Sequence, residues 1–508
     1  MNIRAMPAAW PANKKRGRSV MTPEQRGIPS ESIQKYIEYL EKNKFATHSV
    51  MIMRGDDVVF EKYWAPFHKD FLHRQYSATK SFTAMAVGFA VQDGLLELDA
   101  PMSKYFPEEL KDQASEDMKN QTVRHMLMMS TAKLAKPWFA ARPEDRVKHY
   151  FANDRECSRP SGTIFQYDST GSFVLGALVE KVTGKKMLDY LREKAFDKIG
   201  FSKEAYMLQC PGGWSWADSA LVCKTSDMMK AARLLMNGGR WNGEQLLNEQ
   251  FVKEATTKRI DNNPKNTNDY GLNGYGYLIW MTYGQAYMFD GMGSQFAICV
   301  PEKDLIMVHN ADNQGRAPLA DQQIVDGFFD IIVNSIESDT LPENPAAFAA
   351  LEEYTKDLKL LVAEGEKETA WTQKINGVTY KLGANDMGIT KVRFDFADGK
   401  GKISWTNAQG DKELAFGFGE NVFQKFPQWG YSDQIGTQPG NRLYDCAVSA
   451  GWREDHKLHI KVQIVDDYMG ILDMTFSFTD KRVGIYMVKI AEDFLKEYDG
   501  YAGGTATK

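Results

Sequence analysis

The spacing of apolar residues changes once along the chain, and this change limits the possible folds more than any other feature. Before about residue 336, apolar residues recur at helical spacing in some segments and alternate in others. After Trp371 they mainly alternate, as in Leu458-His459-Ile460-Lys461-Val462, which is typical of strands with one buried face. Residues 337–348, between the two patterns, contain two prolines and three acidic residues. A chain of 508 residues also exceeds one ordinary core, so we expect two folded parts joined by a linker.

The first part, residues 26–336, is expected to be an α+β domain. Apolar runs on either side of the turn Arg54-Gly55-Asp56-Asp57 predict a β-hairpin, and further strands return near the end of this part. This order favours an antiparallel sheet that brings the first and last segments together, with a helical block between them. We expect helices at 31–44, 77–93, 122–129, 144–153, 171–183, 186–197, 225–237 and 321–336, and late strands at 275–281, 286–289, 295–300 and 305–308.

The other segments are expected to be simpler. Residues 1–25 are basic and lack an apolar run, which predicts a disordered tail and not a secretory signal. Residues 337–368 are expected to form a linker and a helix that ends near Ala363. Residues 369–508 are expected to form an all-β accessory domain, a barrel or sandwich of about eight strands. We expect this domain to pack on the first one and to shape or shield its site.

Composition excludes several classes of function. The chain is 43% apolar and 25% charged, as globular proteins are, and its net charge of −5 gives no reason to expect a nucleic-acid partner. It has no run of about eighteen apolar residues, so no membrane span is expected. The five cysteines are scattered and the eight histidines lack the spacing of a zinc site. We therefore expect a cytoplasmic protein without a metal or cofactor.

The strongest candidate for catalysis is the pair Ser77 and Lys80, in Tyr76-Ser77-Ala78-Thr79-Lys80. On a helix, positions i and i+3 lie on one face, so the lysine nitrogen can reach the serine oxygen. The residues that follow are apolar at helical spacing and predict a buried helix. A lysine at such a dry edge can serve as the base that activates a serine nucleophile. Free amide N–H groups at the helix start can stabilise an oxyanion.

Spacing alone is weak support, because Ser-x-x-Lys occurs three times. Ser32, before Lys35, is expected to cap a helix, and Ser130, before Lys133, is expected to lie in the loop after a helix, each with a surface lysine. The run Glu244-Gln245-Leu246-Leu247-Asn248 matches a Glu-x-x-Leu-Asn pattern, but it follows a glycine-rich turn and reads as a connection between helices.

Two later motifs add to the serine–lysine pair. Gln166-Tyr167-Asp168-Ser169 precedes an apolar helix, and its tyrosine could exchange a proton with the pair. Phe289-Asp290-Gly291-Met292-Gly293 lies at a strand, and its glycines let backbone approach a ligand closely. Taken alone, Tyr167 fits an ordinary loop aromatic, and the second motif fits a plain hairpin turn.

In this order, the three motifs resemble those of the serine beta-lactamase and penicillin-binding-protein superfamily. The likeness is to its class C-like branch, which includes esterases, D-aminopeptidases, 6-aminohexanoate-oligomer hydrolases and acyltransferases, and it covers about residues 30–335. Residues 122–130 and 300–305 are also similar to that branch. The resemblance implies the penicillin-recognising fold, with Ser77 as nucleophile, Lys80 as base and Tyr167 as partner in proton transfer. It further implies an oxyanion hole from the N–H groups of Ser77 and Met292. The substrate contacts implied are Ser169, Phe289, Asp290 and Gly291.

The chain departs from the family at two of these positions. Ser169 stands where the family usually has asparagine, and Phe289 stands where it usually has lysine or histidine. Without that cation, and with Asp290 next to it, a carboxylate-bearing β-lactam or D-alanyl substrate loses its partner. The expectation is therefore a serine hydrolase acting on a small-molecule or peptide ester or amide, and not an efficient beta-lactamase. An acyltransferase using the same acyl-enzyme, and a non-catalytic binding or sensor protein on the same fold, remain alternatives.

Overall fold

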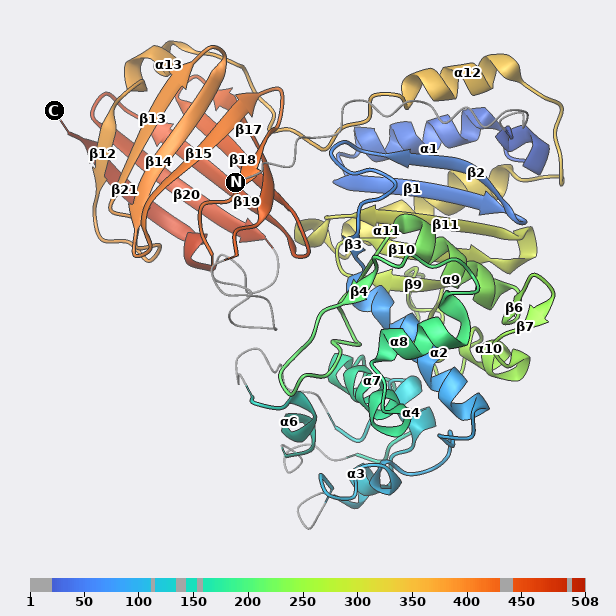
Figure 1. Ribbon diagram of the computed structural model, residues 1–508. Coiled ribbons are helices and arrows are strands. Elements are labelled where there is room, and N and C mark those ends of the chain that lie inside the picture. Colours follow the sequence, from blue (N-terminus) through green and yellow to red (C-terminus); the bar gives the residue numbers. More distant parts are fainter. Residues whose placement is uncertain are drawn as a thin grey trace.

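The computed structural model describes residues 21–110, 115–133, 143–152, 159–429, 442–490 and 496–507. Figure 1 shows two parts, a layered α+β part and a β-barrel beside it. This arrangement confirms the fold class expected from the sequence. Within the described residues, no helix is long and apolar enough to cross a membrane.

A six-stranded antiparallel sheet forms the centre of the first part. The first hairpin pairs with the last long strand of the sheet, with Ile52 opposite Met307, so the two ends of this part meet as the sequence predicts. Every residue of the central strand Leu305–Ala311 is buried, because helices cover both faces. In sheet order the strands are β2 (Asp57–Tyr63), β1 (Thr47–Arg54), β11 (Leu305–Ala311), β10 (Gln295–Val300), β9 (Tyr287–Gly291) and β8 (Trp280–Met281).

Helices cover the two faces of the sheet with different partners (Figure 1). Ile52 and Phe296 face a core that includes α1 (Ser30–Lys42) and α11 (Leu319–Gly327), with α12 (Pro345–Tyr354) beyond. Met51 and Phe289 belong to the larger core on the other face. That face carries α2 (Thr79–Gln92), α3 (Glu116–Asn120), α4 (Val123–Leu127), α6 (Arg146–Ala152), α7 (Ser169–Thr183), α8 (Met187–Leu191), α9 (Thr225–Met236) and α10 (Glu249–Ala255).

A ten-stranded antiparallel sheet forms the second part. Its two end regions meet where β15 pairs with β17 in parallel, and this pairing closes the sheet. Aromatic side chains such as Phe394 and Phe476 fill the interior, with ring centroids 4.9 Å apart. The strands are β12 (Thr379–Leu382), β13 (Lys391–Ala397), β14 (Lys400–Asn407), β15 (Gly410–Phe418), β16 (Val422–Lys425), β17 (Asp445–Glu454), β18 (Lys457–Val465), β19 (Met469–Phe478), β20 (Arg482–Ile490) and β21 (Gly500–Ala506).

Several local predictions were wrong. The helix expected to end near Ala363 ends at Tyr354. The strand expected over 275–281 is regular only at Trp280–Met281, because Leu278 has a φ of 54° that interrupts an extended chain. The second part begins with a short helix, α13 (Ala370–Ile375), and not with a strand.

The predicted tail also needs a correction. Residues 1–20 lie outside the described residues, but Pro23–Arg26 form a 3-10 helix. Glu24 within it is 2% exposed, because its carboxylate accepts hydrogen bonds from the backbone N–H and the hydroxyl of Ser30, at 2.8 and 3.0 Å. This contact holds the 3-10 helix against the first residue of α1.

Candidate active site

Ser77 and Lys80 lie where the first helix of the helical block begins. A 3-10 turn, Tyr76–Ala78, runs directly into α2, so the two side chains share one face of a continuous helical segment. Lys80 Nζ lies 2.8 Å from Ser77 Oγ. The lysine is 2% exposed, while Ser77 is half-buried and therefore reachable from solvent. The structure thus brings the predicted nucleophile and base into contact.

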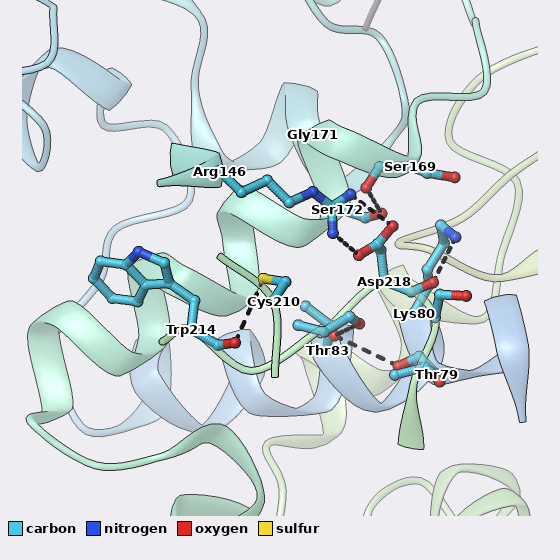
Figure 2. Close-up of polar contacts among 12 residues, drawn as sticks. Thr79, Lys80, Thr83, Arg146, Ser169, Gly171, Ser172, Cys210, Trp214 and Asp218 are labelled. Carbon is cyan, nitrogen blue, oxygen red and sulfur yellow. Dashed lines mark hydrogen bonds and ion pairs between the residues drawn. The ribbon is translucent and has the colours of Figure 1, made fainter. Parts of the chain in front are cut away.

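A backbone carbonyl accepts a second hydrogen bond from the lysine nitrogen. Lys80 Nζ donates to the carbonyl of Asp218 at 2.7 Å. The Asp218 carboxylate accepts two hydrogen bonds from the Arg146 guanidinium, at 2.7 and 3.0 Å, and both side chains are buried. Figure 2 shows Arg146 and Lys80 approaching Asp218 from opposite sides. A buried ion pair thus holds the loop that orients the lysine.

The same loop is tied to α2 by two threonines. Thr83 Oγ1 donates to the carbonyl of Ala217 at 2.6 Å, and Thr79 Oγ1 accepts from the backbone N–H of Leu221 at 3.1 Å. Both threonines lie one turn apart on the helix that carries Lys80 (Figure 2). The loop and the helix therefore form one unit around the lysine nitrogen.

Tyr167 lies beside this pair. Lys80 Nζ is 5.0 Å from the centroid of the tyrosine ring. The ring is 37% exposed and stacks on Trp280 at a centroid distance of 5.5 Å. Ser169 is the first residue of α7, half-buried, and its carbonyl accepts from the Ser172 hydroxyl at 2.8 Å. Tyr167 thus lies beside the base, and Ser169 follows it at the start of α7.

The end of strand β9 packs on the turn that carries the serine. A Cβ atom placed on Gly291 would lie 2.3 Å from the Gln75 carbonyl oxygen and 3.0 Å from the Ala78 nitrogen, so only glycine allows this approach. Met292 follows, with a side chain that is 40% exposed. The backbone expected to supply the second oxyanion N–H therefore lies next to the Ser77 turn.

The structure corrects the expectation for Phe289. Its side chain is fully buried and packs edge-to-face on Phe82 of α2, with centroids 5.9 Å apart. Side chains alternate across a strand, and this one faces the core. Phe289 is therefore a packing residue, and its side chain does not reach a substrate in this conformation.

Asp290 faces the other side of the strand and is partly exposed. Its carboxylate accepts a hydrogen bond from the Tyr270 hydroxyl at 3.2 Å. Burial and the neighbouring charge of Asp321 raise the pKa of Asp290 to about 7, and the charge of Lys80 opposes this rise. The carboxyl group therefore interacts electrostatically with the base.

The other two Ser-x-x-Lys sequences have no comparable geometry. Ser32 lies inside α1 and does not cap it. Ser130 follows α4 in a loop, as expected, and its hydroxyl donates to the His125 carbonyl at 3.0 Å. Lys133 is only 4% exposed, contrary to the expectation of a surface lysine, and its ammonium group donates to the Tyr150 carbonyl.

The Glu-x-x-Leu-Asn run is structural, as expected. Glu244–Gln245 forms a two-residue strand that pairs with Arg240–Trp241. Asn248 then caps α10 by accepting from the backbone N–H of Phe251 at 3.0 Å. These contacts explain the run without catalysis.

Sequence reasoning missed the supports of the site. Asp218 acts through its carbonyl, which any residue could supply, and Arg146 belongs to no recognisable motif. Tyr270 stands in an irregular segment, and Trp280 lies in the two-residue strand β8, and neither belongs to a recognisable motif. Among the described residues, no three His, Cys, Asp or Glu side chains are grouped so that they could hold a metal ion.

Comparison with known proteins finds distant relatives of this chain. Over 254 residues the chain is 24% identical to 6-aminohexanoate-dimer hydrolase from Paenarthrobacter ureafaciens, an alignment that spans 47% of this chain and 64% of that protein. It is 21% identical over 241 residues to an uncharacterized protein of Alkalihalophilus pseudofirmus, spanning 42% of this chain and 66% of that protein. The matches therefore span slightly less than two thirds of either relative.

Solved structures share the fold of the first part. A Bacillus anthracis protein named after the 6-aminohexanoate-dimer hydrolases superposes with a TM-score of 0.50 at 18% identity, over 60% of this chain and 83% of that one. A Bacteroides dorei protein named after beta-lactamases gives 0.50 at 17% identity, over 60% and 98%. A model of the beta-lactamase family matches residues 33–325, more than half of the sequence. The chain belongs to the beta-lactamase family.

Proposed function

We propose that the protein is a serine hydrolase that forms an acyl-enzyme on Ser77. The observation that carries this proposal is the 2.8 Å contact between Ser77 Oγ and Lys80 Nζ. Lys80 acts as the base that takes the hydroxyl proton as Ser77 attacks a carbonyl carbon. The lysine is already oriented by the Asp218 carbonyl, so the attack needs no rearrangement of the base.

The neighbouring groups have separate roles in this proposal. The N–H groups of Ser77 and Met292 stabilise the negative oxygen of the tetrahedral intermediate. Tyr167, beside Lys80, relays the proton that Lys80 accepted to the leaving group. Water then attacks the acyl-enzyme and gives a proton to Lys80, the bond to Ser77 Oγ breaks, and Lys80 returns the proton to the serine. Ser169 and the backbone of Gly291 flank the bound acyl group.

The charge of the site favours some substrates over others. Asp290 directly follows the family's usual cation position in the same strand, and in its ionised form it repels a substrate carboxylate. We therefore propose neutral or cationic esters and amides as substrates and expect slow hydrolysis of penicillins and cephalosporins. A relative named 6-aminohexanoate-dimer hydrolase is consistent with an amide substrate.

A substrate panel tests this proposal. We would measure hydrolysis of p-nitrophenyl esters, p-nitroanilides and nitrocefin by the wild type, and repeat the active cases with a competing alcohol. We expect turnover of an ester or anilide and slower turnover of nitrocefin. A transfer product would show that the alcohol can replace water as the acceptor of the acyl group. Efficient nitrocefin hydrolysis would contradict the charge argument. Inactivity on the whole panel would favour the binding-protein alternative.

A further inference from the structure

The C-terminal barrel contacts the nucleophile turn directly. The backbone N–H of Met469, at the start of β19, donates to the Tyr76 hydroxyl oxygen at 2.9 Å. Tyr76 precedes Ser77, and both partners of this bond are 1% exposed. A small apolar cluster surrounds the contact and joins residues of both parts. Its members are Phe67, Tyr76, Leu360, Ala447, Val465 and Met469.

Tyr468, the barrel residue before Met469, contacts the site through Arg74. The Arg74 guanidinium carbon lies 4.9 Å from the ring centroid of Tyr468, 4.4 Å from that of Tyr76 and 4.7 Å from that of Trp216. Arg74 is fully buried, and its Nε donates to the Ser219 carbonyl at 3.1 Å. Ser219 follows Asp218, whose carbonyl holds Lys80. Tyr468 therefore packs on a cation that contacts the supports of both Ser77 and Lys80.

The barrel loop is itself fixed. Asp467 accepts a hydrogen bond from the Tyr206 hydroxyl in the first part and another from Arg442 of the barrel at 2.5 Å. Gln314 adds a weaker contact from the first part, with its amide nitrogen 3.4 Å from the Met469 carbonyl oxygen. Residues 466–469, which run from the end of β18 to the first residue of β19, are thus held in place by hydrogen bonds to both parts of the molecule.

The backbone at Tyr76 requires such support. Its φ of 44° lies in the left-handed region that non-glycine residues seldom adopt. A conformation of this kind persists only where its surroundings hold it. Gly291 packs on one side of the turn, and the Tyr76 side chain is held by the barrel. We infer that the barrel is a positioning element of the active site, with Tyr76 and Tyr468 as positioning residues for Ser77 and Lys80.

This inference rests on the proposed function only for its rate measurements. Position can also be read without catalysis, from amide hydrogen exchange in a peptide that covers residues 74–80. The backbone N–H groups of Gln75 and Ala78 donate to the carbonyls of Leu221 and Gln75, at 2.9 and 3.1 Å. Exchange at these amides therefore reports whether the turn is held in place.

The first experiment replaces the barrel contact in full-length protein. Tyr468→Leu removes the ring beneath Arg74. Tyr498→Leu removes another barrel tyrosine, also 1% exposed, whose hydroxyl contacts Trp405 and Asn407 away from the site. We expect faster exchange over residues 74–80 and about tenfold slower fluorophosphonate labelling of Ser77 in Tyr468→Leu only. Equal exchange and equal labelling in the two variants would overturn the inference.

A conservative variant keeps the test decisive if Tyr468→Leu does not fold. Tyr76→Phe removes only the hydroxyl that accepts from Met469. Its control is Tyr36→Phe, because the hydroxyl of buried Tyr36 donates to the Ile324 carbonyl at 3.2 Å in the core on the face of the sheet away from α2. We expect a lower kcat with little change in KM for Tyr76→Phe, and faster exchange over residues 74–80. Comparable loss of thermal stability in both, with unchanged kcat and exchange in Tyr76→Phe, would overturn the inference. If wild-type Ser77 is not labelled, the proposed function fails and the exchange result still decides this point.

Discussion

Ser77/Lys80 and Ser130/Lys133 have the same spacing in the same chain but very different surroundings. In the first pair the side chains are 2.8 Å apart, and a carbonyl outside the helix holds the lysine. In the second pair each side chain donates to a different backbone carbonyl, that of His125 or that of Tyr150. The comparison shows that the spacing is useful only where the backbone between the two residues is helical.

Backbone conformation causes the difference. Ser77 lies in a 3-10 turn that continues into α2, so three residues complete one turn. Ser130 follows Met129, whose φ of 56° ends the helical geometry after α4. Lys133 is buried, so burial of a lysine does not by itself create a catalytic pair.

Replacing the two serines should have the largest and most unequal effects. We expect Ser77→Ala to lower turnover by at least about 100-fold with nearly unchanged thermal stability, because the nucleophile is lost. Ser130→Ala should keep its turnover within about twofold and lose only the hydrogen bond to the His125 carbonyl. Steady-state kinetics and thermal unfolding of both variants check this. Substantial activity in Ser77→Ala would exclude it as the nucleophile.

The lysines should differ in the same way. Lys80→Met should reduce turnover by a factor similar to that of Ser77→Ala, since members of one catalytic unit are not additive. Lys133→Met should leave the rate per folded molecule intact and reduce stability by about 1–3 kcal/mol, because the buried Tyr150 carbonyl loses a donor. Active-site titration with a fluorophosphonate and urea denaturation separate the two effects. If Lys80→Met stays active, the base is elsewhere.

The buried ion pair between Arg146 and Asp218 should affect the reactivity of Ser77/Lys80 and not the surroundings of Ser130/Lys133. Arg146→Met leaves Asp218 as an unpaired buried carboxylate, and we expect a loss of about 3–5 kcal/mol in unfolding free energy. The rate of Ser77 labelling should also fall, because the Asp218 carbonyl orients Lys80. The double variant Arg146→Met/Asp218→Asn should recover part of the stability, since it removes the unpaired charge. Labelling as fast as in the wild type would show that this carbonyl does not position the base.

The two lysines also have different carboxyl neighbours, Asp290 for Lys80 and Asp168 for Lys133. Burial raises the pKa of Asp290 from 3.8 to about 7. Between these values the native protein keeps a proton that the unfolded chain releases, so the contribution of Asp290 to stability falls as pH rises from about 4 to 7. Asp290→Asn should therefore raise the melting temperature more at pH 8 than at pH 4.

The control for this small effect is Asp395→Asn. Arg393 lowers the pKa of Asp395, so ionised Asp395 favours the native state. This substitution should lower the melting temperature slightly at pH 8 and less at low pH, the opposite trend. Identical pH trends in the two variants would exclude the assignment of a raised pKa to Asp290.

Local features of the fold could be predicted from the sequence, and contacts between distant segments could not. The β1–β2 hairpin, α2 and α7 follow from periodicity and turn residues, and the Ser77–Lys80 contact follows from helical spacing. The lysine's second partner, Asp218, is 138 residues away, and the contact between Tyr76 and Met469 spans 393 residues. Both contacts use backbone groups, which leave no pattern in the sequence.

The orientation of strand residues shows a second limit. The motif Phe289-Asp290-Gly291 suggested that both side chains face a substrate, but alternation along β9 buries Phe289 against Phe82. Only the position of α2 on that face of the sheet decides which of the two points inward. The sequence predicted the strand but not this packing.

The most direct test of the central claim is intact-mass analysis after exposure to a fluorophosphonate. Wild type, Ser77→Ala and Ser130→Ala would be treated side by side. We predict one adduct on the wild type and on Ser130→Ala, and none on Ser77→Ala. An adduct that persists in Ser77→Ala, or an unmodified wild type, would contradict the assignment of Ser77 as the activated nucleophile.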